Sequence, residues 1–278
     1  MSIGRTAFPP PPARLRLAPP PAHAPTALAV NGLGPLRVST GGRPLDRLTN
    51  RRARSVFAYL LLNPGRSTPK DVLMDLIWPE ASSSAARNNL NVALHGLRRY
   101  LRGSGECGGH ILFQDDGYRI NPEIDLWLDL VQFDRHHAVG RRLGERRDIP
   151  GAVSELEAAE ALYRGPLFED DLYEDWTITP RQAVEDRYVE ALTALAGHYR
   201  ALGDDRACVR VSRKVLALQP MYEAAHRHLM HAYARLDQHH LALRQYRECV
   251  SVLRTELRVP PAPETTRLNE LVRLRRIS

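Results

Sequence analysis

The sequence predicts a mainly α-helical protein whose small β-sheets are confined to its N-terminal half. Two observations predict this. Short β-favouring runs flank three helical patterns before about residue 127, and apolar residues further on repeat at helical spacing with an offset of 34 residues, from Leu195 to Leu229. The length of 278 residues suggests two domains, at roughly 100–200 residues per domain. No apolar run approaches the ~18 residues that a membrane span requires, so no membrane partner is expected.

Residues 1–30 are predicted to form a disordered or polyproline II tail. Eight prolines occur in the first 25 residues, and few side chains there could build a core. The segment lacks the continuous apolar stretch and the cleavage site of a signal peptide. It is either a dispensable tail or a proline-motif ligand for another protein.

The next segment is predicted to begin with a short β-meander or hairpin, followed by a helix. Leu36 and Val38 alternate with polar residues, and Gly41-Gly42 supplies a turn. The first helix spans about 52–62, and it stops at Asn63-Pro64-Gly65, a strong helix breaker.

Two more helices and a second hairpin follow. Thr68 is a natural N-cap, Pro69 fits the first helical position, and Asp71 completes a pattern similar to a capping box. The third helix spans about 83–101, with Ser82 or Ser83 as its cap, and β-favouring runs around Asp116-Gly117 predict a hairpin. Strands, three helices and a hairpin in this order fit a winged helix-turn-helix domain of the response-regulator type.

The third helix has a polar face opposite its apolar stripe, and this face is the candidate DNA-binding surface. In the major groove arginine can pair with guanine, asparagine with adenine, and a valine can contact a thymine methyl group. Recognition helices usually read bases with their N-terminal half. The candidates for base readout are Arg87, Asn88, Asn91 and Val92, and those for backbone contact are His95, Arg98 and Arg99. The alternative is a solvated polar face, which many amphipathic helices have.

Charge is distributed unevenly along the chain, although the total is only +7. Between Arg47 and Arg102 ten basic residues stand against three acidic ones, whereas between Ser154 and Trp176 eight acidic residues stand against one basic one. A basic surface over the three helices fits counterion release from DNA phosphates. The acidic stretch is predicted to be a solvated helix face or loop, or else a docking site for a basic protein.

Further backbone contacts are expected from the first two helices and from the second hairpin. Arg51, Arg52 and Arg54 begin the first helix, where they could contact phosphates or brace the sheet. The hairpin could place a side chain on phosphate or in the minor groove, whereas Asp115 and Asp116 would repel phosphate and should shape the turn. The candidates from these elements are Arg51, Arg52, Thr68, Lys70, Gln114 and Arg119.

The remainder of the chain is predicted to be wholly helical and similar to tetratricopeptide repeats. A 34-residue offset aligns two segments, with small residues where antiparallel helices would cross closely. The aligned positions are Leu195, Tyr199, Cys208 and Val215 with Leu229, Tyr233, Ala242 and Cys249.

Signatures of enzymes and of metal sites are absent from the sequence. It contains no GxxxxGK[ST], HExxH or GxSxG motif, so neither catalysis nor a cofactor is expected. The pairs His136-His137 and His239-His240 diverge by ~100° on a helix, which disfavours a metal site. Three widely spaced cysteines fit a reducing compartment.

Short motifs in the right order carry a resemblance to a known family. The motifs are Leu60–Arg66, Ala86–Leu90, Gly117–Ile120, Tyr163–Leu167 and Glu256–Pro260. With them the chain resembles the SARP (Streptomyces antibiotic regulatory protein) family. The resemblance implies a winged-helix DNA-binding domain over 31–127 and a tetratricopeptide-like bacterial transcriptional activation domain over 128–278.

The resemblance also implies a function. The implied function is that of a transcriptional activator of a secondary-metabolite or other specialised gene cluster. The protein would be cytoplasmic, and nucleoid-associated when bound to DNA. The implied partners are direct repeats in double-stranded promoter DNA, bound as a dimer, and RNA polymerase through its sigma factor and other subunits. Helix 86–99 would enter the major groove, with hairpin 111–120 as the wing. Val92, Gly96 and Arg258 depart from the usual pattern, the first two where the family often has polar or basic side chains.

Two other function classes remain open from the sequence. One is a tetratricopeptide adaptor whose winged helix has lost DNA binding. The other is a ligand sensor in which a small molecule fills the concave repeat surface.

Overall fold

A computed structural model describes residues 27–102, 109–172 and 174–277 of the chain. The chain forms two compact units: Met1–Gln132 with Arg164–Arg181, and Phe133–Tyr163 with Gln182–Ser278. The segment Arg164–Arg181 thus belongs to the first unit, although the segments on either side of it in sequence belong to the second. No helix among the described residues is long and apolar enough to cross a membrane.

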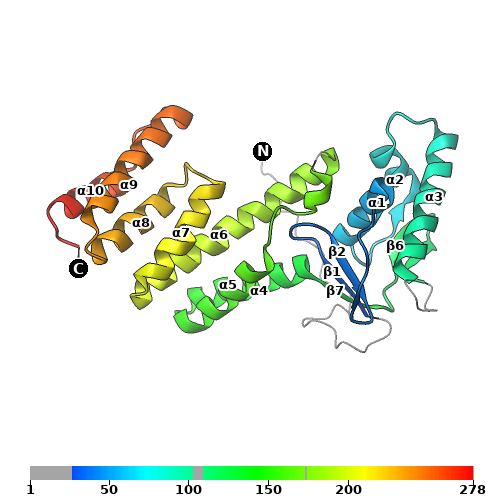
Figure 1. Cartoon of the computed structure of the whole chain (residues 1–278), viewed down its shortest axis with the longest axis horizontal. Helices are drawn as coiled ribbons and strands as arrows, with labels where there is room; N and C mark the ends of the chain where they lie inside the picture. The colour runs from blue at the N-terminus through cyan, green and yellow to red at the C-terminus, as the bar shows by residue number, and fades with distance from the viewer. Residues whose placement is uncertain (1–26, 103–108, 173, 278) are drawn as a thin grey trace. The chain divides into compact units, whose positions relative to one another are not determined.

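The first unit contains a sheet with the strand order β3-β2-β1-β7 (Figure 1). The strands are β1 (Ala27–Asn31), β2 (Arg37–Thr40), β3 (Arg43–Pro44) and β7 (Asp125–Leu128). β1 pairs antiparallel with β2 and parallel with β7. The predicted hairpin at Gly41-Gly42 is confirmed. The predicted tail is wrong over residues 27–30, because Leu28 and Val30 are fully buried in β1, while residues 1–26 lie outside the described part.

Three helices and a small second sheet complete the winged helix. The helices are α1 (Arg51–Leu62), α2 (Lys70–Ile77) and α3 (Ser83–Arg102). The second sheet has the order β4-β6-β5, with β4 (Thr68–Pro69), β5 (Ile111–Gln114) and β6 (Gly117–Ile120). Asn50 caps α1 through its side chain, and Ser82 Oγ accepts a hydrogen bond from Ala85 N at the start of α3.

Thr68 does not cap α2, so this prediction is wrong. The N-cap of α2 is Pro69, and it makes no side-chain cap bond. Thr68 instead lies in β4, where it pairs with Tyr118 of β6 and is only 6% exposed. The backbone of Thr68 is extended because β4 pairs with β6, one of the two strands of the wing.

The turn between β5 and β6 depends on its sequence Asp-Asp-Gly. Asp115 and Asp116 both have φ of 53°, a left-handed conformation that aspartate tolerates better than most residues. A Cβ atom on Gly117 would clash with the carbonyl oxygen of Thr68, so no larger residue fits beside β4. The prediction that the two aspartates shape the turn is confirmed.

Asp129 joins the start of α4 (Asp129–Glu145) to the end of β1. Its buried carboxylate accepts hydrogen bonds from the backbone N–H groups of Gly32, Leu33 and Leu130 at 2.8, 3.0 and 2.8 Å. Burial raises the pKa of Asp129 to about 6, and the three N–H donors limit that rise. This junction fixes the chain where the winged helix ends.

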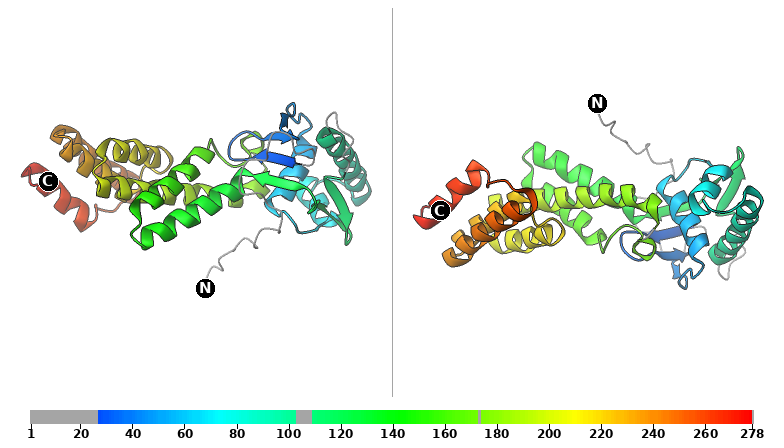
Figure 2. Two further views of the ribbon diagram at one scale, coloured as in Figure 1. Left: turned by 90° about the horizontal axis from the view of Figure 1, so that it is seen from below. Right: turned by 90° about the horizontal axis from the view of Figure 1, so that it is seen from above.

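The second unit is an array of helices, in which α8 packs against α7 and α9, and α10 packs against α8 and α9 (Figures 1 and 2). Besides α4, they are α5 (Ile149–Leu162), α6 (Ile178–Leu202), α7 (Asp205–Leu218), α8 (Glu223–Arg235), α9 (His239–Val252) and α10 (Pro263–Arg273). A π-helical turn, Leu253–Leu257, follows α9. α4 and α6 begin in the first unit and continue into the second.

The 34-residue repeat predicted from the sequence is present in the core of this unit. All eight aligned residues, Leu195 to Val215 and Leu229 to Cys249, are at most 5% exposed. Gly203 and Asp237, which also align, have φ of 80° and 58° and end α6 and α8 in the same way. Cys208 and Cys249 are buried packing residues, whereas Cys107 lies outside the described part. The two repeats are therefore equivalent helix pairs.

Candidate nucleic-acid interface

α3 carries a buried stripe and an opposite polar face, as predicted. Ala86, Leu90, Leu94, Leu97 and Leu101 are each at most 3% exposed. The opposite face exposes Arg87, Asn88, Asn91, Val92, His95 and Arg99, and Val92 is 59% exposed. None of the polar side chains forms a hydrogen bond or an ion pair with another described residue. The structure therefore brings the base-readout candidates together on the N-terminal half of one accessible helix.

Two of the predicted backbone contacts hold the wing in place instead of standing free. Arg98 Nη2 donates a hydrogen bond to the Ile111 carbonyl at 3.2 Å, and its guanidinium carbon lies 5.9 Å from the ring centroid of Tyr118. Lys70 Nζ lies 2.6 Å from Asp116 Oδ1, and the Lys70 N–H donates to the Asp116 carbonyl at 3.1 Å. Both cations thus fix the wing against the helices while remaining partly accessible.

The wing exposes Gln114 and, unexpectedly, an aromatic side chain. The main-chain carbonyl of Gln114 accepts a hydrogen bond from Ser67 Oγ at 2.7 Å. The side chain of Gln114 is not involved in this bond and is exposed. Arg119 is half-buried, and its Nε atom has no hydrogen-bond partner among the described residues. Phe113 is 55% exposed, with its ring 5.0 Å from that of Tyr118. Phe113 is not among the predicted contacts, because alternation along β5 places it on the same face as Ile111, which is buried.

Arginines at the start of α1 pair with the acidic segment 170–174 of the same unit. Arg51 Nη2 and Arg52 Nη1 lie 2.9 and 3.5 Å from Glu174 Oε1. Arg47 pairs with Asp170. These pairs are possible because the segment 164–181 folds back onto the winged helix.

Arg54 is a structural residue. It is 8% exposed, and its Nε and Nη2 atoms donate to Asp171 Oδ2 and Oδ1 at 2.9 and 2.8 Å. It also donates to the carbonyls of Leu48 and Asp170. The bidentate bond to Asp171 raises the pKa of Arg54 further above its usual value. Of the two roles that the sequence left open, bracing is the one that Arg54 performs.

The acidic stretch is therefore mostly paired within the chain, so the prediction of a solvated face is wrong for several of its members. In the first unit Asp170, Asp171 and Glu174 bind arginines. In the second unit Glu160 binds Arg210 and Lys214. Such pairs join positions far apart in sequence, which is why the local pattern did not reveal them.

The helical half of the chain matches the family described as "Bacterial transcriptional activator domain" over residues 128–273. The chain belongs to this family. The chain is therefore a transcriptional regulator, which agrees with its resemblance to SARP proteins. The family model describes a transcriptional activator domain, and the curated relative is a regulatory protein. No cluster of side chains suited to a metal ion occurs among the described residues.

Two relatives add to the match of this family member, and the second of them extends it beyond the helical half. The regulatory protein DnrI of Streptomyces peucetius is 26% identical over 149 residues, which cover 51% of this chain and 54% of that protein. The chain thus aligns with about half the length of this curated relative. The structure of EmbR from Mycobacterium tuberculosis, solved in complex with a low-affinity phosphopeptide, aligns with a TM-score of 0.77 and 26% identity over 90% of this chain and 66% of that one. The predicted fold class, a winged helix-turn-helix followed by a tetratricopeptide-like domain, is confirmed.

Proposed function

We propose that the chain is a sequence-specific DNA-binding transcriptional activator in which α3 enters the major groove. The observation that carries this proposal is the accessible face of α3, on which Arg87, Asn88, Asn91 and Val92 lie together without partners among the described residues. These residue types match the donors, acceptors and methyl groups of base edges. A winged helix presents such a helix from a rigid core, so its side chains reach bases in a fixed register.

The contacts to the DNA backbone in this proposal come from two kinds of side chain: those that are exposed, and those that already have partners in the protein. His95 and Arg99 are exposed on α3, and Gln114 is exposed on the wing. Arg98, Lys70 and Arg119 are held near the wing, where they can contact phosphate while also bracing it. Arg51 and Arg52 must exchange Glu174 for phosphate. Thr68 is not part of the proposed surface, because its side chain is buried.

The rest of the proposal concerns promoters and the transcription machinery. Two protomers would bind direct repeats in promoter DNA, and the activator domain would contact RNA polymerase. The family match to the helical half supports a role in activation. DnrI, which aligns with 51% of this chain, is itself a regulatory protein, and this supports the assignment to regulation.

The decisive experiment selects genomic DNA fragments with the purified full chain and sequences them. We expect fragments that share a direct repeat, with binding that weakens steeply as salt rises. A variant carrying Arg87→Ala, Asn88→Ala and Asn91→Ala should retain weak, salt-sensitive binding without the shared repeat. If this triple variant selects the same repeat as the wild type, α3 is not the reading helix.

Activation is tested separately by transcription in vitro from a selected fragment with purified RNA polymerase. We expect added protein to raise transcript yield from the fragment, and to leave unchanged a promoter that lacks the repeat. A chain that binds the repeat but does not change transcript yield would contradict the activator role and leave DNA binding intact.

A further inference from the structure

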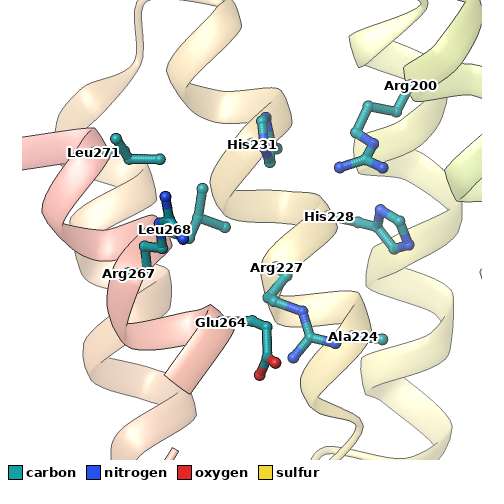
Figure 3. Close-up of a pocket in the computed structure, with 9 residues that line it drawn as sticks. All are labelled: Arg200, Ala224, Arg227, His228, His231, Glu264, Arg267, Leu268 and Leu271. Carbon is teal, nitrogen blue, oxygen red and sulfur yellow. The ribbon is translucent and has the colours of Figure 1, made fainter. Parts of the chain in front are cut away.

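A cavity of about 410 Å³ lies in the second unit, between helices α6, α8 and α10 (Figure 3). Its apolar lining includes Ala224 of α8 together with Leu268 and Leu271 of α10. Sites for small molecules typically measure roughly 300–1,000 Å³, combining apolar walls with a few placed polar groups. The size and lining of this cavity fit that description, and none of its residues takes part in the proposed DNA interface.

Positive charge dominates the rim of the cavity. Arg200 enters from α6, Arg227 from α8 and Arg267 from α10, while Glu264 is the one carboxylate among the lining residues (Figure 3). Among the lining residues the three guanidinium groups exceed the carboxylate by two charges, and Glu223 beside Arg227 offsets one of these. Such an excess in a partly enclosed, apolar setting attracts an anion more strongly than the same charges would on an open surface.

The three arginines differ in how they are held. Arg227 Nη1 donates to Thr265 Oγ1 at 3.0 Å and lies 3.8 Å from Glu223 Oε1, so its guanidinium is fixed between α8 and α10. The guanidinium groups of Arg200 and Arg267 form no hydrogen bond or ion pair with any other described residue. The charges of Arg200 and Arg267 are therefore available to a bound group from two sides of the cavity.

Two histidines on the same wall respond to this charge. Burial and, to a smaller extent, the positive charges of Arg200 and Arg227 together lower the pKa of His228 to about 4. Burial and Arg200 also lower the pKa of His231. Both rings are consequently neutral near pH 7, so the arginines supply the positive potential of the cavity.

We propose that this cavity binds a small organic anion, with its carboxylate between Arg200 and Arg267 and its apolar body against Leu268 and Leu271. Arginine forks match carboxylate geometry and give short, charge-assisted hydrogen bonds. The apolar wall favours an acid with a hydrocarbon body over a fully hydrated inorganic ion. The occupied site would join α6, α8 and α10, so the ligand would stabilise the activator domain by binding its folded form.

The test titrates octanoate into the full chain and follows the ring resonances of His228 and His231 by NMR, assigned with His228→Gln and His231→Gln variants. Octanoate should shift both resonances saturably. Octanol lacks the negative charge and inorganic phosphate lacks the hydrocarbon body, so each should bind at least about tenfold more weakly than octanoate. The double variant Arg200→Gln, Arg267→Gln should weaken octanoate binding by about tenfold or more. Glu264→Gln should strengthen it, because it removes the opposing charge.

Arg244→Gln is the matched control, because Arg244 is an exposed arginine on α9 outside the cavity. It should bind octanoate as the wild type does. Three results would overturn the proposal: no saturable shift at about 10 mM octanoate, equal binding of octanol or phosphate, or a double variant that binds as tightly as the Arg244→Gln control. Retained thermal unfolding midpoints in the variants would show that loss of binding is not loss of folding.

Discussion

Basic residues of the winged helix occur in two contrasting settings, α3 and the start of α1. On α3, Arg87 and Arg99 are exposed and form no ion pair with a described residue. At α1, Arg51 and Arg52 pair with Glu174, and Arg54 is buried against Asp171. The two sets lie within one basic stretch of the sequence, and only their partners distinguish them.

This difference shows that local net charge is a poor measure of a DNA-binding surface. The stretch from Arg47 to Arg102 carries an excess of seven positive charges, but the acidic segment 170–174 neutralises part of it. An arginine with a buried carboxylate partner stabilises the fold, whereas an arginine without one can release counterions from DNA. Separating these roles requires variants that act on one set and spare the other.

The largest effect should come from breaking the Arg54–Asp171 pair. Asp171→Ala leaves the Arg54 guanidinium buried without its carboxylate, which should lower the free energy of unfolding by about 3–5 kcal/mol. Urea unfolding of the full chain measures this. The neighbouring Asp175, which is exposed, provides the control, and Asp175→Ala should change stability by less than about 0.5 kcal/mol.

A variant that removes both charges separates two quantities: the loss of stability caused by an unpaired buried charge, and the net contribution of the ion pair to stability. Arg54→Met combined with Asp171→Leu removes both charges, and it should recover most of the stability that Asp171→Ala loses. If Asp171→Ala costs less than about 1 kcal/mol, the pair does not anchor the segment 164–181, and the contrast between α1 and α3 would disappear.

The second effect concerns α3 and should appear in binding only. Arg87→Ala, Asn88→Ala and Asn91→Ala should each weaken binding to the selected DNA site by about 1–3 kcal/mol, because each removes a base contact. Stability should stay within about 0.5 kcal/mol of the wild type, since all three side chains are exposed. Mobility shifts with the selected site measure specific binding, and mobility shifts with unrelated DNA measure non-specific binding.

Asn89 supplies the matched control on the same helix. It is also an exposed asparagine, but at 100° per residue it lies on the flank of α3 away from Arg87 and Asn91. Asn89→Ala should leave specific binding unchanged. Equal losses from Asn89→Ala and Asn88→Ala would show that the α3 face is not read by position.

The third effect is a gain in stability at Gly96 of α3. A Cβ atom added there meets no heavy atom within 4 Å, so alanine fits and raises the helix propensity. Gly96→Ala should stabilise the chain by about 0.5–1 kcal/mol in urea unfolding. Gly140→Ala in α4 is the contrasting control, because its Cβ would lie 2.8 Å from Leu156 Cγ and should destabilise. A loss of stability in Gly96→Ala would show that this side of α3 is covered.

Local patterns predicted much of this molecule, and long-range pairs account for what they missed. The stripe from Ala86 to Leu101 and the repeat from Leu195 to Cys249 follow helical spacing, so the sequence reveals which of their side chains are buried. Arg54 and Asp171 are 117 positions apart, and no local pattern joins them. Thr68 has the composition of a cap, but its pairing with Tyr118 across the wing determines its conformation.

The smallest effect tests the contrast most directly, at Glu174. Glu174→Gln removes the charge that pairs with Arg51 and Arg52, whose side chains are 57% and 45% exposed. Stability should change by about 1 kcal/mol or less, and DNA binding should strengthen a few-fold at low salt, with the salt dependence steeper by about one to two phosphate contacts. Asp175→Asn removes the same charge from the adjacent position without an arginine partner among the described residues. If both variants strengthen binding equally, general charge explains the effect. If neither does, Arg51 and Arg52 belong to the fold alone, and the DNA interface is confined to α3 and the wing.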